Sequence, residues 1–160
     1  MDALLTAIVI WLSSNYALPD RFDPPRIERV PSIEMASLRY KSLLPTRQRE
    51  ISVIQTQEAS VEKMRDVVGV YNDQTKTIFL SDNWAGSTPA ELSVLVHEMV
   101  HHLQNEAGIK YECPAERERL AYEAQDKWLG LFGRSLQSEF EINGLALLVS
   151  TSCAMAMGLH

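Results

Sequence analysis

Residues 97–102, H-E-M-V-H-H, bring three histidines and one glutamate together within six positions. His97 and His101 are four residues apart, which on a helix is about one turn. Neutral imidazole binds zinc well, and a catalytic zinc site leaves one position for a water molecule whose pKa the metal lowers. Glu98, beside the first histidine, can accept a proton from that water. The pattern H-E-x-x-H is typical of hydrolytic zinc centres, although two histidines on a partly polar helix face would give the same letters.

The residues around the motif predict the helix that carries it. Thr88 is an N-cap residue, Pro89 suits the first helical position, and Glu91 completes a capping box, while Gly108 provides the stop. On this helix His97 and His101 share one side. The opposite side carries an apolar stripe that we expect to pack on a core: Leu92, Leu95, Val96, Met99, Val100 and Leu103. His102 points away from the other two histidines, so we exclude it as a metal ligand.

A third ligand is predicted on the next helix, which begins near Pro114. Glu118 lies at the centre of that helix's apolar side, which also carries Ala121, Tyr122, Gln125, Leu129 and Phe132. A carboxylate in such a place is costly unless it is paired or binds a metal. A salt bridge with an arginine is the alternative. A short connection lets the two helices run antiparallel, so Glu118 can reach the two histidines. Gln125, Tyr122 and Asn105 are candidates to orient the ligands or to be plain polar packing residues.

The segments "VLVHEMVHHLQ" and "ERLAYEAQ" resemble the gluzincin branch of the zincin metallopeptidases, in particular the compact minigluzincins and a small bacterial family of uncharacterised role. This resemblance covers about residues 67–130. It implies one Zn²⁺ per chain, with His97, His101 and Glu118 as ligands and Glu98 as the general base. It also implies that an edge strand at residues 76–81, "KTIFLS", holds a peptide substrate as an added strand. The group that stabilises the oxyanion stays open among Tyr111, Tyr122 and His102.

Composition limits the other function classes. The 160 residues are 46% hydrophobic, which is enough for one core, so we predict a single domain over residues 1–160. A net charge of -6 and the absence of a basic cluster argue against nucleic-acid binding. The apolar start is too short for a membrane span, and Asp2 is atypical of a signal peptide. We therefore expect a core helix, no firm membrane anchor, and a cytoplasmic rather than an exported protein. A disulfide between Cys113 and Cys153 stays open if the chain is exported.

The remaining elements predict an α+β fold: a compact, zincin-like arrangement with a small antiparallel sheet on a mainly helical core and the motif helix at its centre. Helices are expected at residues 3–16, after an N-cap at Ser32, from Pro114, and from about Arg134 to Val149. Strands are expected at Arg26–Val30 and on both sides of the turn "NDQT", with a short strand at Ile51–Ile54 inside a loop over residues 45–63. The function that follows is a zinc metallopeptidase. The alternatives are a zinc-binding module without catalysis and a protein without metal.

Overall fold

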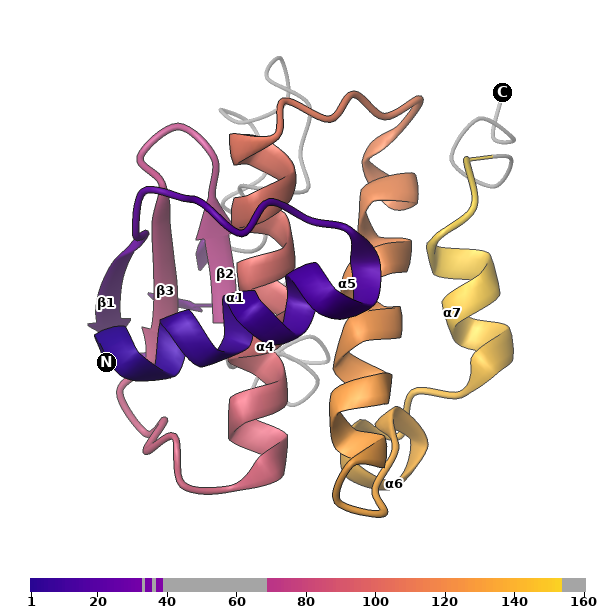
Figure 1. The fold of residues 1–160 in the computed structure, drawn as a ribbon. Coiled ribbons are helices and arrows are strands. Elements are labelled where there is room, and N and C mark those ends of the chain that lie inside the picture. Colours follow the sequence, from indigo (N-terminus) through magenta and orange to yellow (C-terminus); the bar gives the residue numbers. More distant parts are fainter. Residues whose placement is uncertain (33, 36, 39–68, 154–160) are drawn as a thin grey trace. The chain divides into compact units, whose positions relative to one another are not determined.

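The structure is a computed structural model that describes residues 1–32, 34, 35, 37, 38 and 69–153 (Figure 1). Backbone contacts divide the chain into two units. Met1–Pro25 with Gly86–His160 form the first, which is helical, and Arg26–Ala85 form the second, which holds a sheet. The class is therefore α+β, as predicted. Among the described residues no helix combines the length and the apolar character that a membrane crossing requires.

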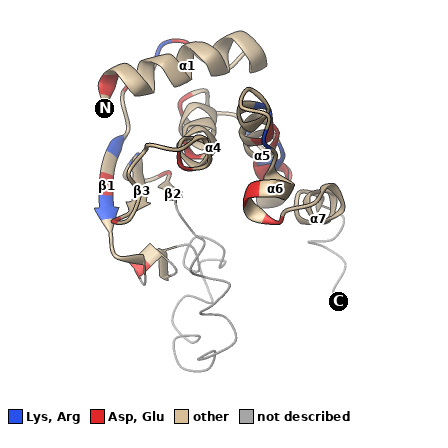
Figure 2. Ribbon diagram, turned by 90° about the horizontal axis from the view of Figure 1, so that it is seen from below, with Lys and Arg blue, Asp and Glu red and all other residues tan. Residues whose placement is uncertain are grey.

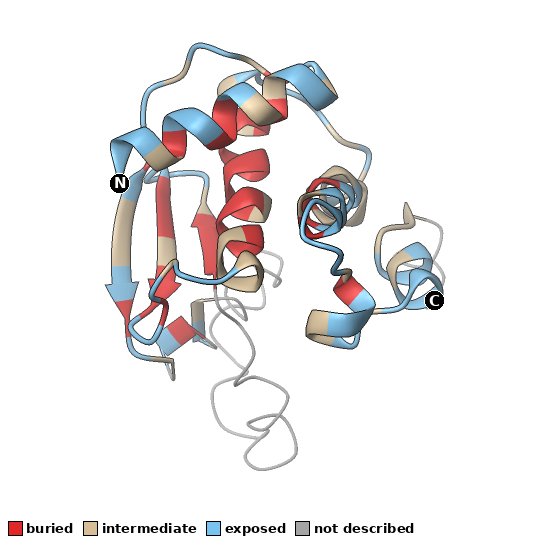
Figure 3. Ribbon diagram, turned by 60° about the horizontal axis from the view of Figure 1, so that its bottom comes forward, coloured by how far each residue is buried: buried red, intermediate tan, exposed pale blue. Residues whose placement is uncertain are grey.

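The helical unit is built around α4 (Pro89–Glu106). The predicted capping box is confirmed: the Thr88 side chain accepts from the Glu91 backbone, and the Glu91 side chain accepts from the Thr88 backbone. Most of the helix is buried (Figure 3). The apolar stripe accounts for much of this burial, with Leu95, Met99 and Leu103 fully enclosed. Burial of such side chains is worth roughly 1.5–3 kcal/mol each, so packing holds α4 in place.

α5 (Pro114–Gly130) packs beside α4 and runs antiparallel to it (Figure 1). The connection turns at Gly108, whose φ of 62° is a conformation that favours glycine. α1 (Asp2–Tyr16) lies against α4, and its side chains Leu5, Ile8 and Leu12 are buried. Its Trp11 ring lies edge-on to the Trp128 ring of α5, with 5.3 Å between the ring centroids. The N-terminal segment is therefore a core helix, as its composition predicted.

The segment after α5 differs from the prediction. In place of one helix from Arg134 to Val149 there are two short ones, α6 (Leu136–Phe140) and α7 (Gly144–Ser150). The break has a local cause, because Glu141 ends α6 in the left-handed region with a φ of 57°, and the Asn143 side chain caps a new start. Beyond α7, Cys153 forms a disulfide with Cys113, the N-cap residue of α5.

The sheet unit contains β1 (Arg26–Val30), β2 (Gly69–Asn72) and β3 (Thr77–Ser81) in the order β1-β3-β2. The predicted hairpin is confirmed, since β2 and β3 pair antiparallel. The prediction of a purely antiparallel sheet is wrong, because β1 pairs parallel with β3, with Arg26 opposite Thr77 and Val30 opposite Ser81. Sequence spacing gave no orientation for β1, whose chain neighbours are not its sheet neighbours.

The prediction that residues 76–81 form an edge strand is also wrong. β3 is the central strand of the three, so its backbone bonds are shared between β1 and β2. Lys76 precedes the strand with a φ of 49°. Other predictions fall wholly or partly outside the described residues: the loop 45–63, the strand Ile51–Ile54, and the helix after Ser32, for which only positions 32, 34, 35, 37 and 38 are described, all helical.

Candidate metal centre

Three side chains from α4 and α5 meet at one point. The Nε2 atom of His97 lies 3.2 Å from the Nε2 atom of His101 and 3.2 Å from Oε2 of Glu118, and His101 Nε2 lies 3.3 Å from Oε1 of Glu118. One ligand atom from each residue lies within 4.8 Å of those of the other two. The structure therefore brings together the three residues that the sequence selected as ligands.

The residue types of the cluster suit a zinc ion. Zinc binds imidazole nitrogen and carboxylate oxygen at about 2.0–2.1 Å. His97 Nε2 lies 3.2 Å from Oε2 of Glu118, whereas His101 Nε2 lies 3.3 Å from the other oxygen, Oε1, and the two Nε2 atoms are 3.2 Å apart. The two imidazoles and the carboxylate thus fit zinc by donor type and by their closeness.

The outer nitrogen of each ring is held by a glutamine. His97 Nδ1 donates to Oε1 of Gln125 at 3.0 Å, and His101 Nδ1 donates to Oε1 of Gln104 at 3.1 Å. The Gln125 amide is oriented in turn by the hydroxyl of Ser93, to which its Nε2 donates at 3.3 Å. Because an amide oxygen only accepts, both rings carry their proton on Nδ1. In the neutral rings, both Nε2 lone pairs then face the cluster, which is the arrangement that a metal requires.

The electrostatics of the cluster depend on Glu118. Its partial burial acts to raise the pKa of its carboxyl group, but the neighbouring His101 and His97 side chains outweigh burial and hold the pKa well below its ordinary range. α4 carries no lysine or arginine, whereas α5 carries both signs of charge, with Arg117 and Arg119 on either side of Glu118 (Figure 2). Glu118 is therefore present as a carboxylate at neutral pH.

Glu118 is less enclosed than the sequence suggested. Its side chain is 36% exposed, against 11% for His97 and 8% for His101. The expected centre of a buried face is thus a half-buried position, because Tyr122 is partly exposed and Phe132 lies beyond the end of α5 and is exposed. The alternative of an arginine salt bridge is not what the structure shows for Glu118, since the side chains that its carboxylate oxygens meet in the described part of the chain are His97 and His101.

The two other charged or polar members of the motif lie outside the three-residue group. Glu98 is buried in α4, with 6% of its surface exposed. His102 is fully buried, and its Nε2 lies 2.7 Å from the carbonyl oxygen of Asp23, with the ring edge-on to Phe22. The exclusion of His102 from the ligand set therefore agrees with the structure, since the ring faces the segment after α1.

The sequence raised two tyrosines as candidates for the oxyanion-stabilising group, Tyr111 and Tyr122. The Tyr122 ring lies edge-on to the His97 ring at 4.7 Å. Tyr111 hydrogen-bonds with Gln104, and its pKa is raised by burial and by Glu116, against opposing effects of Arg117 and that bond. Tyr122 thus touches one ligand ring, and Tyr111 touches the amide that holds the other.

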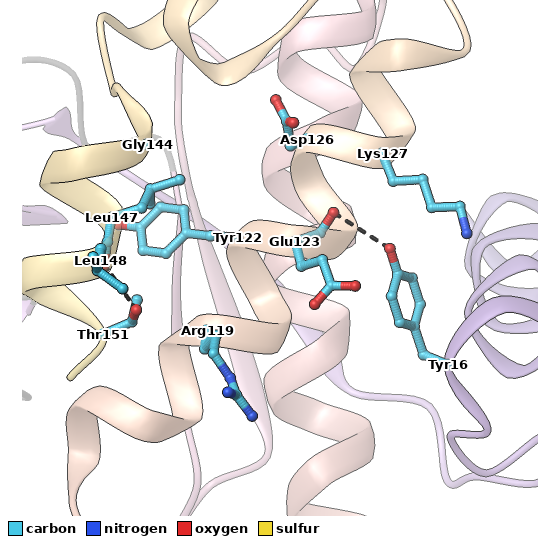
Figure 4. Close-up of a pocket in the computed structure, with 10 residues that line it drawn as sticks. All are labelled: Tyr16, Arg119, Tyr122, Glu123, Asp126, Lys127, Gly144, Leu147, Leu148 and Thr151. Carbon is cyan, nitrogen blue, oxygen red and sulfur yellow. Dashed lines mark hydrogen bonds between the residues drawn. The ribbon is translucent and has the colours of Figure 1, made fainter. Parts of the chain in front are cut away.

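Tyr122 also lines a cavity of about 460 Å³ between α5 and α7 (Figure 4). Leu147 and Leu148 of α7 lie close to the Tyr122 side chain, and Arg119 projects from the preceding turn of α5. Tyr16 from α1 closes another side, with its hydroxyl group donating to the backbone oxygen of Glu123 at 3.3 Å. The cavity is therefore one side chain away from His97.

Sequence reasoning found Gln125 but missed two polar residues at the centre. Gln104 lies on the same side of α4 as His97 and His101, about 20° from His97 on a helical wheel, so the wheel that selected the histidines could have found it. Arg117 could not be found in this way, because its side chain reaches Gln104 across the interface between two helices. Asn105, which was expected to orient a ligand, is the next residue after Gln104 and is partly exposed.

The fold and the site together define an α+β protein with a candidate two-histidine, one-glutamate metal centre. The chain belongs to the family described as a domain of unknown function, DUF6647, whose model matches residues 1–157. No curated protein and no solved structure matches the chain.

Proposed function

We propose that this protein is a zinc-dependent metallopeptidase of the gluzincin type, with one zinc ion held by His97, His101 and Glu118. The observation that carries the proposal is the direction of the two imidazole rings. Both rings have their Nδ1 atoms bonded to amide oxygens, so both Nε2 lone pairs meet a carboxylate at about the same point. Such a triangle of electron pairs is unfavourable unless a cation lies within it.

Zinc at this position would supply a Lewis acid and lower the pKa of a nearby water molecule. We assign Glu98 the role of general base: it takes a proton from the attacking water and later gives a proton to the leaving amine. Its position directly after His97 in the H-E-x-x-H motif supports this assignment. The half-exposed side chain of Glu118 is consistent with access from solvent.

The proposed substrate is a peptide. The cavity beside Tyr122 offers a place for an apolar substrate side chain, since Leu147 and Leu148 form part of its wall.

The disulfide bears on the compartment. Disulfides persist in oxidising environments and are rare in the cytosol. The bond between Cys113 and Cys153 therefore supports an exported protein over the cytoplasmic location that the N-terminal sequence favoured. Thiol counting on protein isolated in the presence of an alkylating agent tests this. Two cysteines that the agent leaves unmodified, because they form the disulfide, support export. Two alkylated cysteines support the cytoplasm.

The test of the function separates metal binding from catalysis. Purified protein should contain about one zinc per chain, and His97→Ala should lose it. Glu98→Gln should keep the zinc and abolish hydrolysis of a broad peptide library. If Glu98→Gln keeps full activity, Glu98 is not the base. If the wild-type protein holds zinc but cleaves no peptide, it is a zinc-binding module of the same fold.

His102→Gln serves as a matched control in the same motif. This substitution removes a buried imidazole that contacts Asp23 and Phe22, so the melting temperature should fall while the zinc content stays near one per chain. Loss of zinc from this variant at a temperature where it is folded would contradict the ligand assignment.

A further inference from the structure

Behind His101, one glutamine and one arginine join the two helices that carry the ligands. Gln104 Oε1 accepts from His101 Nδ1 at 3.1 Å and from Arg117 Nε at 3.3 Å, while Gln104 Nε2 donates to the backbone oxygen of Arg117 at 3.2 Å. Arg117 Nη2 donates to the backbone oxygen of His101 at 3.1 Å. Gln104 is 1% exposed, so its donor and its acceptor are both satisfied by protein groups.

We propose that Gln104 and Arg117 form a positioning unit that holds His101 and Glu118 at metal-binding distance before a metal arrives. The inference rests on the proposed metal site and names residues that neither touch the metal nor react. Gln104 fixes the tautomer and rotation of the His101 ring, because its amide oxygen takes the Nδ1 proton.

Arg117 acts on the second ligand through the backbone. It immediately precedes Glu118, so bonds from its side chain and its backbone oxygen to α4 fix the turn of α5 from which Glu118 projects. The planar guanidinium group spans two acceptors at once, an amide oxygen and a backbone carbonyl. A lysine has a single charged nitrogen on a flexible stem and cannot bridge the same two atoms in one geometry.

The experiment measures zinc affinity by competition with a chelator for four variants and two matched controls. Gln104→Ala, Arg117→Ala and Arg117→Lys should bind zinc about 10- to 100-fold more weakly than the wild type. Gln104→Glu keeps an oxygen that accepts from His101 and Arg117 but loses the amide that donates to the backbone oxygen of Arg117, so its zinc affinity should lie between those of the wild type and Gln104→Ala. The controls, Gln137→Ala in α6 and Arg119→Lys in α5, change exposed side chains of the same types and should bind as the wild type does.

The Co²⁺-loaded proteins provide a readout other than affinity or activity. The visible absorption bands of Co²⁺ report the geometry of its ligands, so they should change in Gln104→Ala, Arg117→Ala and Arg117→Lys and stay as in the wild type in both controls. The melting temperature of each metal-free variant identifies plain loss of fold. A lower melting temperature with unchanged Co²⁺ bands and unchanged zinc affinity of the folded protein would overturn the positioning role.

The failures are distinguishable. Zinc-free wild-type protein that takes up no zinc overturns the proposed function. Wild-type protein that binds zinc, together with Gln104→Ala and Arg117→Lys variants that bind it equally well, overturns only the positioning unit. If Arg117→Lys binds zinc as the wild type does while Arg117→Ala binds it weakly, the positive charge at this position is sufficient. The two bonds of the planar guanidinium group would then not be needed.

Discussion

The Nε2 atoms of His97 and His101 lie 3.2 Å apart, and the far side of each ring is bonded to the amide oxygen of a glutamine. Two neutral imidazoles held in this way repel each other unless a proton or a metal ion lies between them and Glu118. The protein thus keeps three like electron pairs together by bonds made outside the cluster.

Removal of the metal should lower stability. With zinc at about 100 times its dissociation constant, binding contributes about 2.7 kcal/mol, which for a chain of this size corresponds to roughly 5–10 °C in melting temperature. Calorimetry with and without chelator checks this. Glu118→Gln removes one ligand charge, so its melting temperature should respond little to the chelator. A full chelator response in that variant would show that zinc binds elsewhere.

Gln125→Ala should weaken zinc binding by about 10- to 100-fold, because the His97 ring loses the acceptor that sets its tautomer. Ser93→Ala removes only the group that orients Gln125, so its effect should be smaller. Chelator competition gives both dissociation constants. A dissociation constant in Gln125→Ala equal to that of the wild type would show that this amide does not position the His97 ring.

Reduction of the disulfide should destabilise the helical unit. The bond closes a loop with a sequence separation of 40, for which chain entropy gives about 3–4 kcal/mol. Thermal melts with and without reductant, and of a Cys113→Ala/Cys153→Ala double variant, measure the loss. The double variant should be insensitive to reductant. Equal melting temperatures for oxidised and reduced wild type would contradict a stabilising bond.

Ionisation of Tyr16 at alkaline pH should lower the stability of the protein. Burial, and the nearby Glu123 and Asp126, raise its pKa from 10.0 to about 12. A group whose pKa rises on folding contributes stability that is complete below its unfolded pKa and is lost as pH rises from about 10 to 12. Tyr16→Phe should flatten the fall in melting temperature over that range. Ultraviolet titration of tyrosinate should lose its latest step in the same variant.

The features that could be predicted from the sequence are those that depend on residues close together in the chain. The boundaries of α4 followed from Thr88, Pro89 and Glu91, whose capping roles involve only neighbouring residues. The grouping of His97, His101 and Glu118 followed from helical spacing together with one carboxylate on an apolar face. These predictions needed no knowledge of how distant segments pair.

The pairing of distant strands and the break between α6 and α7 could not be predicted in this way. The parallel pairing of β1 with β3 joins strands that are far apart in the chain, and alternation of residue types does not encode direction. The break at Glu141 was missed because a non-glycine residue adopts the left-handed conformation there. Arg117 was missed for a related reason, since its partners lie on another helix.

All three candidate ligands come from one helical hairpin, with His97 and Glu118 only 21 positions apart. The entropy cost of closing so short a segment is small, and contacts of low sequence separation form early in folding. An ion captured by α4 and α5 would therefore order this hairpin while the remainder of the chain is still unstructured. The centre would then act as a nucleus for refolding as well as a part of the finished protein.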